Sequence, residues 1–387
     1  MNTLARVQKV ALPIAVVGLA VLLAGAFSEP TRAFTNLLVG ALLVMGLATG
    51  AMVWLCLLAV ANAGWAAVLR RVLEGFGAFV PVGALLILAT TPGLRAVYAW
   101  ARPDAGADPL MVAKAAFLNP TFFLIRMVVI LAAWTLFTAR LRRWSLSQDA
   151  AVLATGAPGD ATAATKRWAA GFLATFAITA CLAAFDWVMT IEASWYSTIF
   201  GLYNLAGILA SSAAAVAIAA VLLHRAGALP ELRPDHLHDL GKLMLGFATF
   251  WGYLWFCQFL LIWYSNLPDE TAYFELRWQG GWQPLFFANL LLGWTVPFLA
   301  LLPRSAKRSP SHLLRVGGLM LAARWLDLWL MTMPGNFPTR PWPGLYELAG
   351  VVGPLALFVF ITTRTFQRVP LIARRDPFLA ESLHHHI

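Results

Sequence analysis

Long apolar runs separated by short polar segments recur along the whole chain. A helix needs about 20 mostly apolar residues to cross the hydrocarbon core of a membrane. Ten runs approach that length, and they are predicted to be helices because backbone polar groups inside a membrane must be satisfied within the segment. The runs cover residues 10–27, 34–63, 72–90, 121–141, 168–189, 198–223, 240–264, 285–302, 313–333 and 345–365. The pattern predicts an all-α membrane protein with ten transmembrane helices in a single polytopic domain, residues 1–387.

The composition agrees with this class, because 60% of residues are hydrophobic and only 12% are charged. Soluble domains carry about 25% charged residues. The net charge of +10 comes from basic residues in short loops between apolar runs, so no nucleic-acid partner is expected. The first run has no convincing small-residue cleavage site after it and is expected to remain as a helix.

Lysine and arginine are divided unequally between the two sides of the predicted helices. One side, with both termini, holds 20 of them and the other holds 6, while Arg126 and Arg324 lie inside spans. Cytoplasmic loops are enriched in these residues. Both termini are therefore predicted to be cytoplasmic, with residues 366–387 as a cytoplasmic tail. The longer segments 91–120 and 265–284 on the other side are either solvated connections or docking sites for an extramembrane partner.

No ligand set for a redox cofactor or a metal is visible. Cys56, Cys181 and Cys257 are far apart, and no C-x-x-C pair is present, so iron–sulfur and covalent haem c ligands are not expected. No histidine lies deep inside a span, which argues against a bis-histidine haem b. A P-loop and a dinucleotide fingerprint are also absent from the sequence.

The most informative stretch is residues 186–195, where the fifth apolar run meets the sixth. It holds two carboxylates, Asp186 and Glu192, and two tryptophans, Trp187 and Trp195, but no positive charge. A charge in the hydrocarbon layer costs roughly 2.5 to 3.5 kcal/mol at a helix centre on insertion scales. These carboxylates are therefore expected to serve proton transfer, a ligand or a buried ion pair.

Further ionisable residues lie in or beside the spans. In the outer half they are Arg126, Asp186, Glu192, Arg324, Asp327 and Glu347. Arg324 and Asp327 share a helical face, either as a structural ion pair or as part of a proton or ligand site. Arg126 is expected to snorkel outward or to pair with Asp186 or Glu192.

At the inner side, Glu74, His238 and Asp239 either anchor the helices at the interface or form an inner site of proton uptake. Polar residues between the two groups are sparse, so two half-channels are favoured over one continuous channel.

Several stretches carry a family resemblance. They are residues 186–192 with 195–203, 114–119 with 122–126, 143–149, 238–242, 258–268, and 375–377 with 381–384. Together they resemble the ActF-type, NrfD-like membrane subunits of bacterial alternative complex III, a quinol:cytochrome c oxidoreductase. Many such subunits carry Pro and His where this chain has Ala193 and Ser194, so a histidine relay is not expected here.

The resemblance implies two four-helix bundles plus two peripheral helices, in a bacterial inner (cytoplasmic) membrane. It also implies a complex with a paralogous NrfD-like membrane subunit, an iron–sulfur subunit and multihaem cytochrome c subunits, with membrane lipids and a terminal oxidase as further partners. Haem c and iron–sulfur clusters would then belong to the partners and not to this chain.

The main hypothesis from the sequence is a supporting role in proton translocation and assembly. Its candidate residues are Glu74, Asp186, Glu192, His238, Asp239, Arg324 and Asp327. A second hypothesis is a direct quinone or menaquinone site, formed by Arg126, Asp186, Trp187, Glu192 and Trp195. A purely structural scaffold subunit and a solitary transporter are the two remaining hypotheses.

Overall fold

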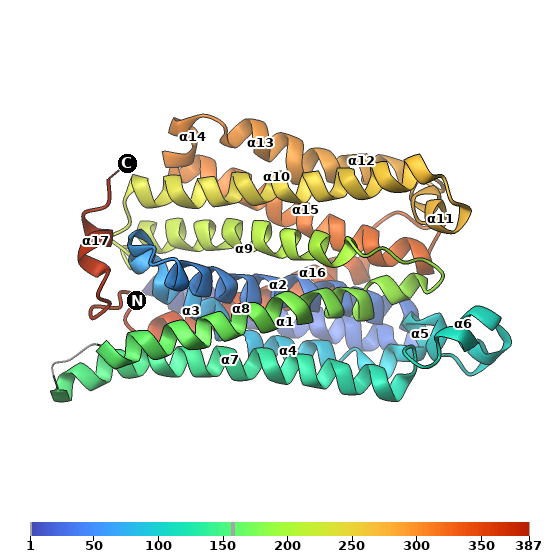
Figure 1. Cartoon of the computed structure of the whole chain (residues 1–387), viewed down its shortest axis with the longest axis horizontal. Helices are drawn as coiled ribbons and strands as arrows, with labels where there is room; N and C mark the ends of the chain where they lie inside the picture. Colours follow the sequence, from blue (N-terminus) through green and yellow to red (C-terminus); the bar gives the residue numbers. More distant parts are fainter. Residues whose placement is uncertain (1, 156–158, 387) are drawn as a thin grey trace.

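The computed structural model describes the backbone of residues 2–155 and 159–386, and the side chains of residues 3–147 and 163–386. Helices account for nearly all of this part, and it contains no strand. The long helices run side by side along the longest axis of the molecule (Figure 1). Nine helical segments in the described part are long and apolar enough to cross a membrane. The predicted class, a helical multi-pass membrane protein, is therefore confirmed.

Eight helices are long and continuous: α1 (Asn2–Ser28), α2 (Pro30–Val60), α7 (Pro120–Thr155), α8 (Gly159–Trp187), α9 (Phe200–Arg225), α10 (Pro234–Ser265), α15 (Pro310–Asn336) and α16 (Leu345–Arg368). Shorter helices connect them: η2 (Thr91–Gly93), α5 (Leu94–Val97), η3 (Ala99–Ala101), η4 (Pro103–Ala107), α6 (Pro109–Lys114), η5 (Met189–Glu192), α11 (Pro268–Arg277), α14 (Arg304–Arg308) and α17 (Leu379–Leu383). Seven of these eight long helices are among the nine apolar segments. The exception is α15, whose apolar run contains the charged residues Arg324 and Asp327.

The two remaining spans are interrupted by proline. One consists of η1 (Gly64–Leu69), α3 (Arg70–Gly77) and α4 (Val80–Leu88), with Pro81 in the first turn of α4. The other consists of α12 (Gln283–Leu290), the π-helical turn η6 (Leu291–Thr295) and α13 (Val296–Leu301), with Pro297 at the start of α13. Proline has no N–H and clashes with the carbonyl four residues earlier, so each helix is broken or widened just before it.

Helix α2 lies at the centre and contacts α1, α3, α4, α8, α9, α15 and α16. On one side of it α7 packs on α8 and α4, and on the other α9 packs on α10 and α15, while α13 and η6 cover α10 and α15.

Helix α16 packs closely on both α1 and α2. Glycines allow these contacts, since a Cβ at Gly18 of α1 would lie 2.6 Å from Cα of Gly353, and one at Gly40 of α2 would lie 1.8 Å from the carbonyl oxygen of Gly350. Small residues are the usual means of close helix packing in membranes. The first two helices and the last long one are thus joined along a seam of glycines.

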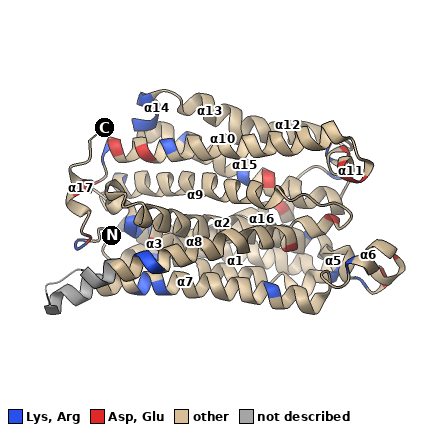
Figure 2. Ribbon diagram, in the orientation of Figure 1, with Lys and Arg blue, Asp and Glu red and all other residues tan. Residues whose placement is uncertain are grey.

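Both ends of the described chain lie at the same end of the helical bundle, called the terminal end below (Figure 1). The short helices α5, α6 and α11 lie at the opposite end. Lys and Arg residues gather mainly at the terminal end, around α3, α14 and the near ends of α7, α8 and α10 (Figure 2). The segments predicted as the two long outer connections are thus folded into short helices at the opposite end.

Candidate functional site

The six ionisable residues predicted for the outer half, together with Arg32 and Arg277, form four separate ion pairs rather than one cluster. They are Arg32–Glu347 (2.8 Å), Arg126–Asp186 (2.7 Å), Arg277–Glu192 (2.6 Å) and Arg324–Asp327 (2.6 Å). Of the pairings considered from sequence, Arg324 with Asp327 and Arg126 with Asp186 are confirmed. The partners of Glu192 and Glu347 were not foreseen.

Asp327 lies at the centre of a buried polar network between four helices. Its carboxylate accepts hydrogen bonds from Arg324 Nη1 (2.6 Å) on its own helix and from Asn289 Nδ2 (3.0 Å) on α12. It also accepts from the Tyr203 hydroxyl on α9 and from Trp251 Nε1 (3.3 Å) on α10. Asp327 is only 2% exposed. A buried carboxylate is strongly disfavoured unless it is paired and hydrogen-bonded, and these four donors satisfy that requirement.

Two glycines make room for this network. A Cβ at Gly207 would lie 2.4 Å from Arg324 Nη1, and a Cβ at Gly293 would lie 2.8 Å from the ring of Trp251. Gly293 belongs to the π-helical turn η6. Such turns are frequent at functional sites. The proline-widened helix therefore places its glycine where the indole of Trp251 must approach Asp327.

Three small cavities adjoin this ion pair. One of about 40 Å³ is lined by Arg324 and extends to Trp187. Two of about 20 Å³ each border Asp327, and one of them also borders Arg277. About 10 to 15 Å³ and two to four polar partners suffice for one water. Asn289 Oδ1, which borders the same cavity as Arg277, is buried without a hydrogen-bond partner among the described residues. The surroundings of Asp327 can therefore hold water.

Arg277 links this region to the opposite end of the bundle. It holds Glu192 through two hydrogen bonds (2.6 and 3.3 Å) and donates to the carbonyls of Tyr273 (2.7 Å) and Leu330 (2.9 Å). Burial alone would lower the pKa of Arg277, but the Glu192 carboxylate raises it above its ordinary value. The Glu192 side chain is 13% exposed, whereas that of Arg277 is 1% exposed. Glu192 thus lies between solvent and the cavity that Arg277 shares with Asp327.

The pair formed by Arg126 and Asp186 has a different character. Arg126 binds both carboxylate oxygens (2.7 and 3.0 Å), donates to the Phe117 carbonyl (3.1 Å) and covers the rings of Phe117 and Phe122 at 3.9 and 4.2 Å. Asp186 is fully buried. This geometry is typical of a structural ion pair that fixes α7 against α8.

The five quinone candidates do not converge on one point. Trp187 is buried and lines the cavity beside Arg324. Trp195 stacks on Tyr273 at a centroid distance of 4.0 Å and donates to the Glu270 carbonyl (3.1 Å). The other three, Arg126, Asp186 and Glu192, are engaged in the two ion pairs described above.

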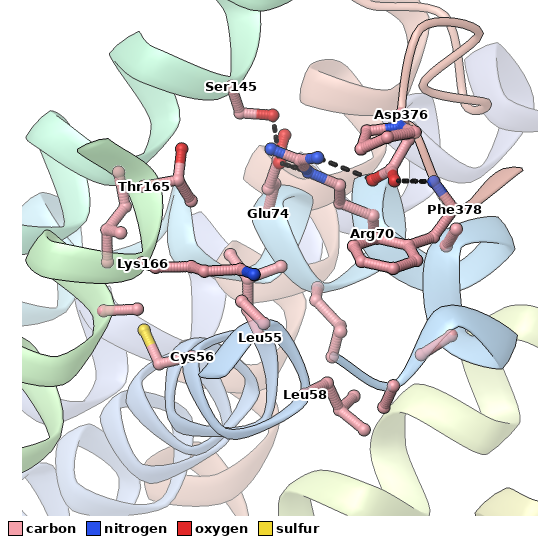
Figure 3. A pocket seen from close by; sticks show the side chains of 18 residues that line it. Leu55, Cys56, Leu58, Arg70, Glu74, Ser145, Thr165, Lys166, Asp376 and Phe378 are labelled. Atoms are coloured by element: carbon pink, nitrogen blue, oxygen red, sulfur yellow. Dashed lines mark hydrogen bonds and ion pairs between the residues drawn. The ribbon is translucent and has the colours of Figure 1, made fainter. Parts of the chain in front are cut away.

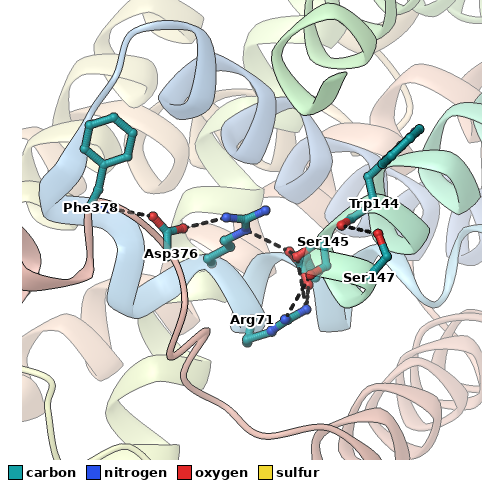
Figure 4. Close-up of polar contacts among 8 residues, drawn as sticks. Arg71, Trp144, Ser145, Ser147, Asp376 and Phe378 are labelled. Atoms are coloured by element: carbon teal, nitrogen blue, oxygen red, sulfur yellow. Dashed lines mark hydrogen bonds and ion pairs between the residues drawn. The ribbon is translucent and has the colours of Figure 1, made fainter. Parts of the chain in front are cut away.

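Glu74 forms the first polar cluster of the terminal end, beside a pocket (Figure 3). It binds Arg71 (2.5 Å) and Arg70 (3.1 Å) and accepts a hydrogen bond from the Ser145 hydroxyl. Arg70 also pairs with Asp376 of the C-terminal tail (2.6 Å), as Figure 3 shows. Asp376 in turn accepts a hydrogen bond from the Phe378 N–H (2.9 Å; Figure 4). These donors meet the condition for burying a carboxylate, which must be both paired and hydrogen-bonded.

Asp239 forms a second cluster with Lys242 (2.5 Å) and His385 (2.7 Å). Asp239 and Lys242 are three residues apart and share one face of α10. His238 is buried, and its Nδ1 has no hydrogen-bond partner among the described residues. The sequence pattern did not reveal that the tail contacts both clusters, through Asp376 and His385.

Ser382 holds the tail in place. Its hydroxyl donates to the Trp65 carbonyl (2.6 Å) and accepts from the Val68 N–H (3.2 Å), and its carbonyl accepts from His236 Nε2 (3.0 Å). His236 Nδ1 accepts from the Arg233 N–H (3.0 Å), so Nε2 must carry the proton. The segment predicted as a cytoplasmic tail is therefore docked on η1 and α10.

The chain was compared with protein families and with curated proteins. No family model matches it, and no curated protein matches it significantly. The resemblance drawn from the sequence remains a prediction.

Proposed function

We propose that this protein is a membrane subunit of a quinol:cytochrome c oxidoreductase of the alternative complex III type, in a bacterial inner membrane. In this proposal α15 is a tenth transmembrane helix, both termini are cytoplasmic, and the helices form two four-helix bundles with α1 and α16 at the periphery. The redox groups, haem c and iron–sulfur clusters, belong to partner subunits. The subunit supports proton movement and assembly.

The observation that carries the proposal is the network around Asp327. This carboxylate has four donors, borders two water-sized cavities, and shares one of them with Arg277. A structural ion pair needs no adjoining cavity. A proton site needs a group that can be protonated and neighbouring waters that exchange protons with it.

In the proposed outer half-channel, Asp327 takes a proton from a hydronium ion in the cavity that it shares with Arg324; the carboxylate is neutralised and a water molecule remains. Arg324 and Tyr203 then reorient their hydrogen bonds to the neutral acid. The proton leaves through the cavity toward Glu192, which lies nearest to solvent. Moving one charge across a potential of 100 mV involves about 2.3 kcal/mol, so such a path has a clear energetic role.

In the proposed inner half-channel, Glu74 and the pair of His238 and Asp239 take up protons at the terminal end. Helices α2 and α9, which together contact α3, α10 and α15, pack closely on each other. Gly50 lies against Ser212, and Trp54 Nε1 donates to Ser212 Oγ (3.1 Å). Passage between the two halves would require movement of these helices or transient hydration.

Purification under mild detergent tests the assignment to a complex. Recovery of the chain together with haem-staining, iron-containing subunits is expected. Recovery of the chain alone, in a stable and monodisperse form, would refute it.

Proton translocation tests the mechanism. Replacing Asp327 by Asn in the complex, reconstituted in vesicles, should lower the number of protons moved per electron. Asp186→Asn is the matched control, since it removes a buried, arginine-bound carboxylate that lines none of the cavities described above. A reduced ratio in Asp327→Asn with an unchanged ratio in Asp186→Asn supports the proposal. An unchanged ratio and rate in Asp327→Asn refutes it.

A scaffold without a proton path is the second candidate function. The observation in its favour is that all carboxylates of the opposite half named above are bound by arginine. A scaffold predicts that the Asp327→Asn variant loses stability or assembly but keeps the proton ratio.

A further inference from the structure

The pocket at the terminal end lies beneath the C-terminal tail, between α2, η1, α3, α7 and α8. Its volume of about 70 Å³ is several times what one water needs. Most of its lining is apolar and small, with Leu55, Leu58, Ala59, Ala66 and Ala67 on α2 and η1. Water in a pocket needs two to four polar partners, so this wall favours an apolar chain.

The carboxylates of the pocket are already neutralised. Glu74 is bound by Arg70 and Arg71, and Asp376 is bound by Arg70. Lys166 differs from these groups. Among the described residues it contacts only uncharged groups, the side-chain oxygen of Asn62 and the ring of Phe378 at 6.0 Å. Within the described part of the chain, a positive charge at the rim therefore remains without a neutralising carboxylate.

Lys166 extends from α8 over the pocket, where Figure 3 shows it beside the apolar wall. The neighbouring part of α7 adds the exposed cations Arg140 and Arg143. The pocket thus combines an apolar interior with a cationic rim at the end of membrane-spanning helices. Anionic lipid headgroups are attracted to such basic boundaries, by about a factor of five per lysine or arginine.

We propose that this pocket binds one anionic phospholipid. An acyl chain occupies the alanine- and leucine-lined interior, and the phosphate contacts Lys166. The tail closes the site through Phe378, held in position by the Arg70–Asp376 ion pair. This inference concerns a site that the proposed proton path does not need, and it stands independently of that path.

The test uses the full-length chain in detergent and a phosphatidylglycerol carrying a photoreactive acyl chain, with the matching phosphatidylcholine as the neutral probe. Cross-linking is followed by peptide mapping. Phosphatidylglycerol should label residues 55–67 several times more strongly than phosphatidylcholine. Lys166→Gln should lower phosphatidylglycerol labelling about fivefold, to the level of the neutral lipid, and Lys166→Arg should restore it. Ala59→Phe should abolish labelling by both lipids.

Arg167→Gln is the matched control, because it removes a neighbouring charge that does not line the pocket. Its labelling should equal that of the unchanged chain. Equal labelling by the two lipids, an equal loss in Arg167→Gln and Lys166→Gln, or labelling confined to residues that do not line the pocket would overturn the proposal. If Ala59→Phe fails to fold by size-exclusion chromatography, the comparison of Lys166→Gln with Lys166→Arg decides.

Discussion

Gly207 of α9 lies directly against the guanidinium group of Arg324, so that a Cβ atom there would be 2.4 Å from Nη1. The ion pair between Arg324 and Asp327 therefore depends on a residue that carries no polar side chain. Arg324 cannot move freely, because it also donates to Asn204 Oδ1 (3.2 Å).

Gly207→Ala is accordingly expected to displace Arg324 and lower the stability of the protein by about 1–3 kcal/mol, the usual cost of overpacking. Gly318→Ala on α15 is the control, since nothing lies within 4 Å of its added Cβ. That change should be neutral or stabilise the helix by up to about 1 kcal/mol. Thermal unfolding in detergent measures both. Equal melting temperatures for the two variants would contradict the packing argument.

Arg324→Ala should be more damaging, because it leaves the Asp327 carboxylate buried without its cation. Breaking a buried pair from one side costs about 3–5 kcal/mol. The double variant Arg324→Ala with Asp327→Ala removes both charges and should recover part of that loss. A double-mutant cycle on melting temperature or denaturant midpoint measures the coupling. Strictly additive losses would mean that the two charges do not stabilise each other.

Lys307 of α14 satisfies the end of α13, where its ammonium donates to the carbonyls of Leu301 (2.7 Å), Leu302 (2.9 Å) and Pro303 (3.4 Å). Lys307→Met removes all three bonds. We expect a loss of about 1.5–3 kcal/mol at neutral pH, the range for hydrogen bonds made by a charged group. Lys307→Arg keeps a donor and should lose less. Thermal unfolding at pH 7 measures this, and an unchanged melting temperature in Lys307→Met would contradict it.

The same lysine predicts a pH dependence. Burial, followed by the nearby charge of Lys242, lowers the pKa of Lys307 below the ordinary value of 10.5. Between the lowered pKa and 10.5 the unfolded chain binds more protons than the folded one, so stability from this group increases as the pH rises through that window and is lost as the pH falls. The stability difference between the unchanged protein and Lys307→Met should therefore grow as the pH rises from the lowered pKa toward 10.5. A stability difference that becomes smaller as the pH rises would contradict this prediction.

Ser382→Ala should loosen the docked tail. It removes the hydrogen bonds of the hydroxyl with Trp65 and Val68, which together contribute about 1–3 kcal/mol. Faster amide hydrogen exchange is expected in residues 376–386, with unchanged exchange in the buried helix α9. Ser147→Ala is the control, because its hydroxyl donates to the Trp144 carbonyl of its own helix. Equal exchange in both variants would show that Ser382 does not hold the tail.

The helices were predictable because apolar runs of membrane length leave the backbone no other structure. Pro81 and Pro297 mark the two interruptions in the sequence, but Pro354 lies inside the continuous helix α16, so proline alone does not separate an interrupted span from a continuous one. The ion pair of Arg324 and Asp327 could be predicted from local sequence, because residues three apart on a helix share a face.

Predicting the other ion pairs would have required knowledge of how the helices are rotated and packed against one another. Glu192 pairs with Arg277, and Glu347 pairs with Arg32, across long sequence separations that no local periodicity reports. One signal for the Asp327 network was present but not used. Asn289 lies alone in an apolar span, and a polar residue there is retained mainly where it has a partner inside the protein.

The glycine contacts that α16 makes with α1 and α2 join the first long helices of the chain to its last. During synthesis α1 and α2 are made before α7, α8, α9, α10 and α15, and α16 is made after these helices. Gly18 and Gly40 therefore have no contact with Gly353 and Gly350 until α16 has been synthesised. The contact can therefore form only after α16 has been synthesised, and a chain interrupted before α16 would leave the glycine surfaces of α1 and α2 uncovered.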